Sequence, residues 1–221
     1  HGKPQAEAVA HTEGPLLILA GAGSGKTRVL TRRIAYLLSQ RLARRNEILA
    51  VTFTNKAAKE MQHRIAELCG PGRFPDLGTF HSVCSRWLRQ YHDRLGLAKE
   101  FAIYATDEQL IVMKAVLKEA NRDEKKFTPR SMLSSVSRCK NHMLTPDGAE
   151  KAARNRFELD MVEIYRRYQK KLQENQAVDF DDLLLRTVEL LQKNPDVLAE
   201  FRQRIRYILI DEYQDVNAVQ Y

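Results

Sequence analysis

The chain has 221 residues, of which 43% are hydrophobic, and its formal net charge is +8. This length and composition allow a sizeable buried core, in one large domain or two small ones. The positive charge favours a polyanionic partner, and both nucleic acid and an anionic membrane surface fit it. No run of eighteen apolar residues and no apolar N-terminal segment occurs, so we expect a soluble, unsecreted and cytoplasmic protein.

The three cysteines are Cys69, Cys84 and Cys139. They are odd in number, widely spaced and form no Cys-x-x-Cys pair, which argues against a zinc site and against a disulfide framework. We expect them to be reduced residues that pack in the interior.

Between residues 4 and 94 short apolar runs alternate with amphipathic segments, as is typical of a parallel sheet covered by helices. The expected strands are Leu16 to Ala20, Ile48 to Phe53 and Leu77 to Thr79. The expected helices between and after them are Lys26 to Gln40, Asn55 to Cys69 and Phe80 to Leu95.

A glycine-rich turn joins the first strand to the first helix. Its residues are Ala20, Gly21, Ala22, Gly23, Ser24, Gly25, Lys26 and Thr27. Such a turn points its backbone N–H groups inward at a helix N-terminus, where it can hold a triphosphate. Lys26 would reach the β- and γ-phosphates and Thr27 would bind Mg²⁺. Ala20 stands where the P-loop pattern has its first glycine, and its small side chain changes little.

From Thr106 to Ile205 the pattern is almost entirely helical, so we expect an all-helical insert. Turn or cap signals occur at Thr128-Pro129, at Thr145-Pro146 and at Asn194-Pro195. Basic residues are spread along these helices, and each by itself is expected on a solvated face. They include Lys125, Lys126, Arg138, Lys140, Arg166 and Arg167.

Three acids lie close together within the insert, at Asp179, Asp181 and Asp182. They could bind a metal ion, but the favoured interpretation is that Asp179 or Asp181 caps a helix whose first turn accepts negative charge. The leucines at 183–185 would then pack in the core.

The final apolar run, Tyr207 to Ile210, is expected to be a strand buried on both faces that returns to the sheet. Asp211 and Glu212 follow it. Together with a P-loop, Asp211 would bind Mg²⁺ through water and Glu212 would polarise the attacking water. The alternative is that both acids cap a helix that begins near Asp215.

Two further motifs follow the second and third strands. Residues 50–61 read AVTFTNKAAKEM and residues 78–82 read GTFHS, while residues 211–215 read DEYQD. This ordered set, with the P-loop, resembles the superfamily 1A DNA helicases, the bacterial group of UvrD, Rep and PcrA. The resemblance runs through essentially the whole chain.

The resemblance implies two sets of binding residues. In that family an N-terminal glutamine reads the adenine edge, which Gln5 matches, and Arg28 and Arg32 of the P-loop helix would lie near the nucleotide. Single-stranded DNA would be contacted by Phe53, Thr54, Asn55 and His81. An aromatic face suits this role because base stacking on it tolerates any sequence.

The resemblance also implies an α/β fold, in which a RecA-like P-loop NTPase sheet carries the inserted all-helical domain. Residues 1–100 and 201–221 would form the RecA-like domain 1A, and residues 101–200 the helical domain 1B. The family's next motif and its second motor domain, 2A with 2B, are missing from this chain, so we expect little unwinding from it alone. The strand of that next motif separates the acidic strand from the P-loop strand, so either the acidic strand moves beside the P-loop strand or another segment fills the space.

The function that this implies uses ATP and Mg²⁺ to move 3′ to 5′ along single-stranded DNA, at junctions with duplex. Two alternatives stay open: a nucleotide- and DNA-binding module without turnover, and part of a helicase-nuclease of the RecB or AddA kind. A small-molecule kinase would leave the segments TFTN and TFHS unexplained.

Overall fold

The computed structural model describes residues 15–20 and 26–211. These residues divide into two compact units. Unit 1 comprises the described residues up to 83 together with 191–211, and unit 2 comprises residues 84–190. Within the described residues, the chain therefore leaves unit 1 once and returns to it.

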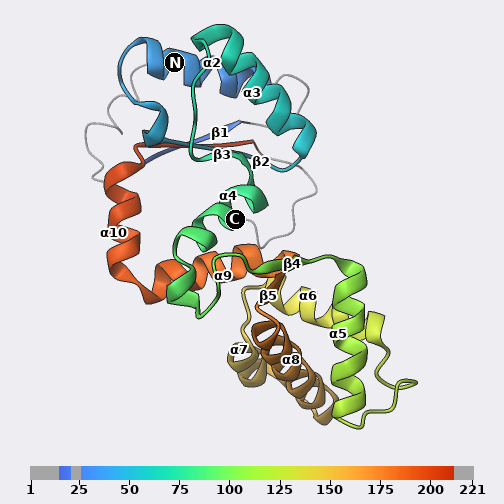
Figure 1. The fold of residues 1–221 in the computed structure, drawn as a ribbon. Helices are drawn as coiled ribbons and strands as arrows, with labels where there is room; N and C mark the ends of the chain where they lie inside the picture. Colours follow the sequence, from blue (N-terminus) through green and yellow to red (C-terminus); the bar gives the residue numbers. More distant parts are fainter. Residues whose placement is uncertain (1–14, 21–25, 212–221) are drawn as a thin grey trace. The chain divides into compact units, whose positions relative to one another are not determined.

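Unit 1 is built on a four-stranded parallel sheet with the order β1-β6-β2-β3 (Figure 1). The strands are β1 (Leu16–Ala20), β6 (Tyr207–Asp211), β2 (Ile48–Thr52) and β3 (Leu77–Thr79). The four strands expected from the sequence agree with these to within one residue. Because all the strands are parallel, their carboxyl ends lie at one edge of the sheet.

Helices α2 (Lys26–Ser39) and α3 (Asn55–Cys69) cover one face of this sheet (Figure 1). Both carry apolar residues at helical spacing, which places a continuous stripe against the strands. The buried residues of this cluster include Leu30, Ile34, Leu37, Met61 and Ile65 from the helices and Ile48, Ala50, Leu77 and Leu209 from the strands.

The opposite face of the sheet is less covered at β1 and β6. Leu17 and Leu19 of β1 are 53% and 49% exposed, and Ile208 and Ile210 of β6 are half-buried. The prediction that the Tyr207 to Ile210 strand is buried on both faces is therefore wrong. Alternate residues of this strand differ in burial because α2 and α3 pack only against the face that carries Leu209.

Polar contacts hold the returning segment in unit 1. Helix α10 (Pro195–Arg204) leads into β6, and its last residue donates from Nη1 to the carbonyl of Asn46 at 2.8 Å and forms an ion pair with Asp76. Nε of Arg206 pairs with Oε2 of Glu47, in the 3₁₀ helix Arg45–Glu47, at 2.8 Å. Both ends of the short segment between α10 and β6 are thus tied to unit 1.

Unit 2 is mainly helical. Its helices are α5 (Thr106–Glu119), α6 (Pro129–Asn141), α7 (Pro146–Ala152) and α8 (Arg156–Glu174), with a 3₁₀ helix at His92–Leu95. Helices α4 (Phe80–Gln90) and α9 (Phe180–Lys193) carry the chain between the two units.

The expected start signals in unit 2 are confirmed. The Thr128 hydroxyl accepts from the backbone N–H of Ser131, and the Thr145 hydroxyl accepts from that of Gly148, each at 3.2 Å. Asn155 caps α8 in the same way. These bonds satisfy N–H groups that the first turn of a helix leaves without an intrahelical partner.

The core of unit 2 lies between α5, α6 and α8. Its largest members are Tyr165 and Tyr168, both with no exposed surface. They pack with the apolar residues Val112, Met113, Val116, Leu117, Met132, Val136, Val162, Ile164 and Leu172.

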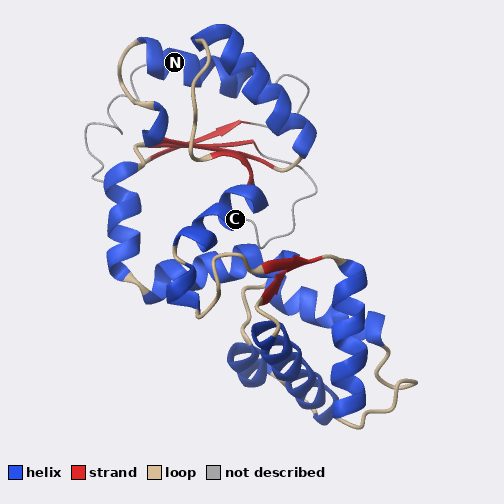
Figure 2. Ribbon diagram, in the orientation of Figure 1, coloured by secondary structure: helices blue, strands red, loops and turns tan. Residues whose placement is uncertain are grey.

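Unit 2 also contains two strands that the sequence did not predict. β4 (Ala102–Tyr104) pairs in parallel with β5 (Ala177–Asp179), and Figure 2 shows them among the helices. The expectation of an all-helical insert is corrected by this pair. Three residues are too few to show a period, so only their pairing across the fold identifies them.

The three cysteines are free, as expected. Burial raises the pKa of the Cys84 and Cys139 thiols, which keeps them protonated.

Candidate functional site

The carboxyl edge of the sheet in unit 1 gathers most of the described residues singled out in the sequence. Across this edge, β1, β6, β2 and β3 end at Ala20, Asp211, Thr52 and Thr79. Ligands of open α/β sheets bind at this edge because the loops that follow the strands converge there. Each predicted motif begins in the last residues of one of these four strands.

The P-loop has the expected frame. β1 ends at Ala20 and α2 begins at Lys26, so the strand end and the helix start occur where the pattern requires them. Thr27 is half-buried in the first turn of α2, where its carbonyl accepts a hydrogen bond from the Thr31 hydroxyl. The turn residues Gly21, Ala22, Gly23, Ser24 and Gly25 lie outside the described residues, as do Gln5 and Glu212.

Asp211 lies directly beside the P-loop strand. β6 pairs with β1 over five residues, and the last pair in this register is Ala20 with Asp211. β6 also pairs with β2 on its other side. Of the two arrangements that the sequence left open, the acidic strand has taken the position beside the P-loop strand. Its backbone groups are therefore satisfied on both sides.

A groove of about 490 Å³ lies between α2 and α3. Two of its charged pairs are internal to α3, where Arg64 binds Glu60 at 2.6 Å and His63 lies 3.0 Å from Glu67. The guanidinium groups of Arg28 and Arg32 are exposed, and neither forms a hydrogen bond or ion pair with another described residue. The groove is therefore lined by two exposed cations of α2.

Thr27 and Asp211 would offer a hydroxyl and a carboxylate oxygen, the ligand types that Mg²⁺ prefers. Such sites take few protein ligands and are completed by water and substrate phosphates. Within residues 15–20 and 26–211, no group of three or more His, Cys, Asp or Glu side chains could hold a metal ion. The oxygen chemistry of Thr27 and Asp211 fits a metal bound jointly with a phosphate ligand.

The ends of β2 and β3 carry the second set of residues. The ring of Phe53, just after β2, lies 5.1 Å from that of Phe80, just after β3, with an interplanar angle of 39°. Thr54 caps α3 by accepting from the backbone N–H of Ala57 at 3.1 Å. Asn55 is exposed and His81 is half-buried. The edge thus brings Phe53, Thr54, Asn55 and the segment with His81 to neighbouring strand ends.

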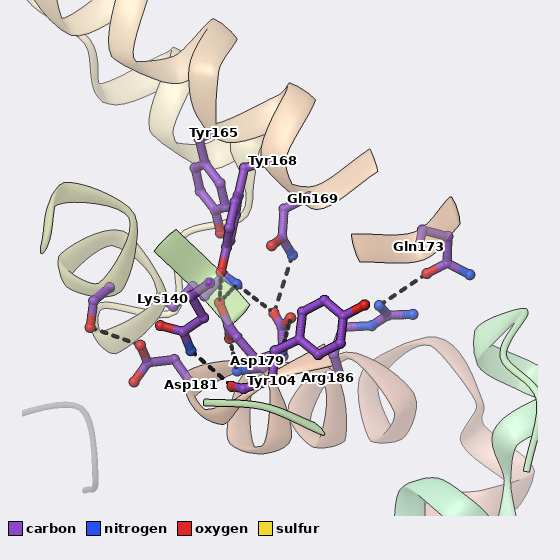
Figure 3. A network of polar contacts seen from close by, with 12 residues as sticks. Tyr104, Lys140, Tyr165, Tyr168, Gln169, Gln173, Asp179, Asp181 and Arg186 are labelled. Carbon is purple, nitrogen blue, oxygen red and sulfur yellow. Dashed lines mark hydrogen bonds and ion pairs between the residues drawn. The ribbon is translucent and has the colours of Figure 1, made fainter. Parts of the chain in front are cut away.

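In unit 2 the structure contains a buried ion cluster that the sequence did not reveal (Figure 3). Lys140, expected on a solvated face, is 1% exposed. Its Nζ lies 2.6 Å from Oδ2 of Asp179 and 2.9 Å from Oδ1 of Asp182. The Tyr168 hydroxyl donates to Asp179 at 3.0 Å, and Gln169 donates to Asp182 at 3.1 Å. Lys140 lies in the last turn of α6, and that position gives no local signal of its burial.

Asp179 and Asp182 also cap α9 reciprocally. The backbone N–H of Asp182 donates to Oδ1 of Asp179 at 2.9 Å, and that of Asp179 donates to Oδ2 of Asp182 at 3.1 Å. The cap expected at Asp179 is confirmed, whereas Asp181 instead accepts from the hydroxyl of Ser137 at 2.8 Å. These bonds join the end of β5 rigidly to α9.

Burial and charge shift the pKa values in this cluster. Burial, together with the nearby Asp182 carboxylate, raises the pKa of Asp179 to about 6 despite the opposing effect of Lys140. Burial alone would lower the pKa of Lys140, but the attraction of Asp182 and Asp179 outweighs it and the pKa is raised. Lys140 is therefore a cation at neutral pH, shared between two carboxylates.

In the part of the chain that the structure describes, no helix is both long enough and apolar enough to cross a membrane.

A family model described as the UvrD/REP helicase N-terminal domain matches residues 2–221. The chain is 49% identical over 218 residues to the ATP-dependent DNA helicase PcrA of Bacillus subtilis, a match that covers 98% of this chain and 30% of that protein. The protein of the same name from Leuconostoc citreum is 49% identical over 219 residues, covering 98% of this chain and 29% of that protein. The one from Staphylococcus aureus is 47% identical over 218 residues, with 98% and 30% covered.

The chain thus spans about 30% of the length of these curated relatives. The family model covers almost every residue, and it includes the P-loop, the segments at residues 50–61 and 78–82 and the acidic strand. The chain belongs to the UvrD/REP helicase family and corresponds to its N-terminal domain.

Proposed function

We propose that this chain is the ATP-binding and single-stranded-DNA-binding N-terminal part of an ATP-dependent DNA helicase that moves 3′ to 5′. The observation that carries the proposal is the shared edge of the sheet in unit 1. Asp211 lies next to the end of the P-loop strand, and Phe53 and Phe80 follow the two strands on its other side. Nucleotide and DNA would therefore bind at adjacent strand ends of one rigid sheet.

On the nucleotide side, Lys26 would neutralise the β- and γ-phosphates, and the N–H groups of the turn 21–25 would surround them. Thr27 and Asp211 would hold Mg²⁺, which supplies charge neutralisation when bound. Glu212 would accept a proton from a water molecule. The oxygen of that water would attack the γ-phosphorus as the bond between this phosphorus and the ADP oxygen breaks. Arg28 and Arg32, which are exposed residues of α2, would contact the nucleotide from the groove between α2 and α3. Gln5 would read the adenine edge.

On the DNA side, Phe53 would stack on a base, and Thr54, Asn55 and His81 would contact the strand. Packing on Phe80 limits the movement of the Phe53 ring, which lowers the entropic cost of ordering it on a base. Stacking does not discriminate between bases, which suits a protein that moves along any sequence.

We further propose that unit 1 corresponds to the RecA-like domain and unit 2 to the inserted domain. The rest of the full-length protein would supply the second motor domain and a cation for the γ-phosphate, a contribution worth about 10³ to 10⁵ in rate in related systems. Closure of two such domains around ATP would alternate their grip on DNA at junctions. The relatives are more than three times as long as this chain, which supports the proposal that the rest of the full-length protein supplies the second motor domain.

Two other functions use the same site. As it stands, the chain could be a nucleotide- and DNA-binding module without turnover. It could also belong to a helicase-nuclease of the RecB or AddA kind. The high identity to proteins named as DNA helicases favours the leading proposal over the second of these.

The test is phosphate release by the 221-residue chain with Mg-ATP, with and without single-stranded DNA. Lys26→Ala is the inactive variant, and Lys170→Ala, an exposed lysine of α8 in unit 2, is the matched control. Release that DNA stimulates, that Lys26→Ala abolishes and that Lys170→Ala preserves supports a coupled ATPase. Binding of ATP and DNA without release supports the module instead, and failure to bind ATP contradicts both.

A further inference from the structure

The short segment between α10 and β6 carries two arginines that contact the starts of neighbouring strands. The Arg204 guanidinium forms an ion pair with Asp76, the residue before β3. Nε of Arg206 lies 2.8 Å from Oε2 of Glu47, the residue before β2. Both contacts therefore lie at the amino edge of the sheet in unit 1, at the opposite end of β6 from the carboxyl edge.

The two carboxylates that bind these arginines are held in place by the fold. The side chain of Asp76 is almost completely buried. Glu47 is half-buried, and its Oε1 accepts from the backbone N–H of Arg44 at 2.8 Å while Oε2 binds Arg206. The backbone N–H of Arg206 also donates to the carbonyl of Glu47 at 2.8 Å. Each arginine thus has a fixed partner at the start of a neighbouring strand.

The apolar pattern of β6 does not by itself determine which residues the strand pairs with. Tyr207 and Leu209 are buried on one face, whereas Ile208 and Ile210 are half-buried on the other. A shift of β6 by one residue would exchange the two faces and is therefore disfavoured. A shift by two residues toward the carboxyl edge preserves the faces, and it brings the apolar residue Ile205 to the place of Tyr207.

Such a shift would move Asp211 away from the P-loop strand. In the observed register Asp211 lies opposite Ala20, the last residue of β1. Two residues of a strand measure about 6.6 Å, so the carboxylate would lie beyond the end of β1 and no longer opposite Ala20. A shift in the other direction would bury Asp211 at the place of Leu209, which is unfavourable for a carboxylate.

We propose that Arg204 and Arg206 are positioning residues for the ATP site. Their ion pairs at the amino edge fix the register of β6, and that register sets the position of Asp211 at the carboxyl edge. About 16 Å of strand separates Arg206 from Asp211, so the arginines act through β6 and not by contact with the nucleotide. This inference rests on the proposed function, which assigns Mg²⁺ binding to Asp211.

Disulfide formation between β1 and β6 reports the register directly. Leu19 and Ile210 are paired in the observed register, with Cα atoms about 5 Å apart, a separation that a disulfide spans. The Cα atoms of Leu19 and Ile208 are then about 8 Å apart, which is too far, and they are paired only after the two-residue shift. Leu19→Cys with Ile210→Cys therefore reports the observed register, and Leu19→Cys with Ile208→Cys reports the shifted one. The single-cysteine variants control for the three native cysteines.

Each cysteine pair is combined with Arg204→Gln, with Arg206→Gln and with both. In the double variant the ratio of shifted to observed cross-link should rise by about tenfold, because both ion pairs exist only in the observed register. Arg206→Lys retains a cation and should restore part of the observed cross-link. Arg202→Gln is the matched control, because Arg202 is an exposed residue of the same helix and the variant loses the same charge.

A second measurement connects the register to the ATP site. In variants without the added cysteines, the Mg²⁺ concentration needed for half-maximal binding of a fluorescent ATP analogue should rise with the cross-link ratio. Circular dichroism checks the fold of every variant. If the glutamine variants of the arginines do not fold, Glu47→Gln replaces them, because it keeps the oxygen that accepts from Arg44 and removes only the charge that binds Arg206.

The cross-links are measured without nucleotide, so they separate this inference from the function on which it rests. If the arginine variants cross-link like Arg202→Gln, the ion pairs do not fix the register and the proposal is overturned. It is also overturned if the cross-link ratio rises while the Mg²⁺ dependence of ATP binding stays that of the unmodified chain. If the unmodified chain binds no ATP analogue, the proposed function fails, and the positioning role fails with it even where the cross-links shift.

Discussion

Nζ of Lys140 lies 2.6 Å from Oδ2 of Asp179, and neither side chain is more than 4% exposed. The contact joins the last turn of α6 to the end of β5, across 39 residues of sequence. Asp182 supplies a second carboxylate at 2.9 Å, so one cation is shared by two anions. Such a cluster is stable only while its charges are compensated, because burial opposes every uncompensated charge.

Lys140→Met should strongly destabilise the chain at neutral pH. The variant keeps a long, unbranched side chain but leaves two buried carboxylates without a cation, a change that costs about 3 to 5 kcal/mol in comparable clusters. The free energy of unfolding in urea measures it, with exposed Lys170→Met as the control. A loss no larger than that of the control would mean that the cluster is solvated.

The effect of Lys140→Met should also diminish as the pH falls from 7 to 5. Without the ammonium, burial holds the pKa of the two carboxyls above the unfolded value of 3.8, so the folded variant takes up protons in this range and the unfolded chain takes up fewer. Because the folded variant takes up more protons than the unfolded chain, lowering the pH stabilises the folded form. Urea unfolding at both pH values checks this, and a constant difference from the unmodified chain would contradict it.

Asp179→Asn should change the pH dependence of the unmodified chain. The pKa of Asp179 is raised from 3.8 to about 6 in the folded state, so between these values the folded form binds more protons than the unfolded form. Stability from this group therefore increases as the pH falls through 6 toward 4, and is absent above 6. We expect the unmodified chain to gain stability relative to Asp179→Asn as the pH falls from 7 to 5. Parallel pH profiles would show that Asp179 does not titrate there.

Thr54→Ala should destabilise unit 1 by about 1 kcal/mol, because the N-cap bond from Ala57 to the Thr54 hydroxyl is lost. Thr54→Ser retains that bond and should restore stability. Thermal unfolding of both variants measures the effect. If serine restores stability but not the affinity for single-stranded DNA, the methyl group of Thr54 contributes to the DNA contact as well.

Phe53→Ala should weaken single-stranded DNA binding by about 1 to 3 kcal/mol, the usual contribution of one stacked base. Because Phe53 also packs on Phe80, the stability of the variant must be measured beside its affinity. Phe53→Tyr keeps an aromatic face and should bind nearly normally. Equal affinities for all three proteins would exclude stacking at this position, while retained ATP binding would confirm that the nucleotide site is intact.

The sequence by itself determined the features that depend on short stretches of chain. Two elements have the predicted bounds, the strand Leu16–Ala20 and the helix Asn55–Cys69. The predicted helix caps occur at Thr128 and Thr145. These features are predictable because periodicity and capping depend on neighbouring residues. The ordered motifs also identified the family, as the match over residues 2–221 confirms.

The tertiary structure alone decided which distant segments meet. It placed Asp211 beside Ala20, paired β4 with β5 across about 75 residues, and buried Lys140 against Asp179 and Asp182. None of these three contacts has a local sequence pattern. A helical lysine, for example, has the same neighbours in sequence whether it is exposed to water or buried in an ion cluster. Its environment depends on which carboxylates the rest of the chain brings to it, and that depends on long-range packing.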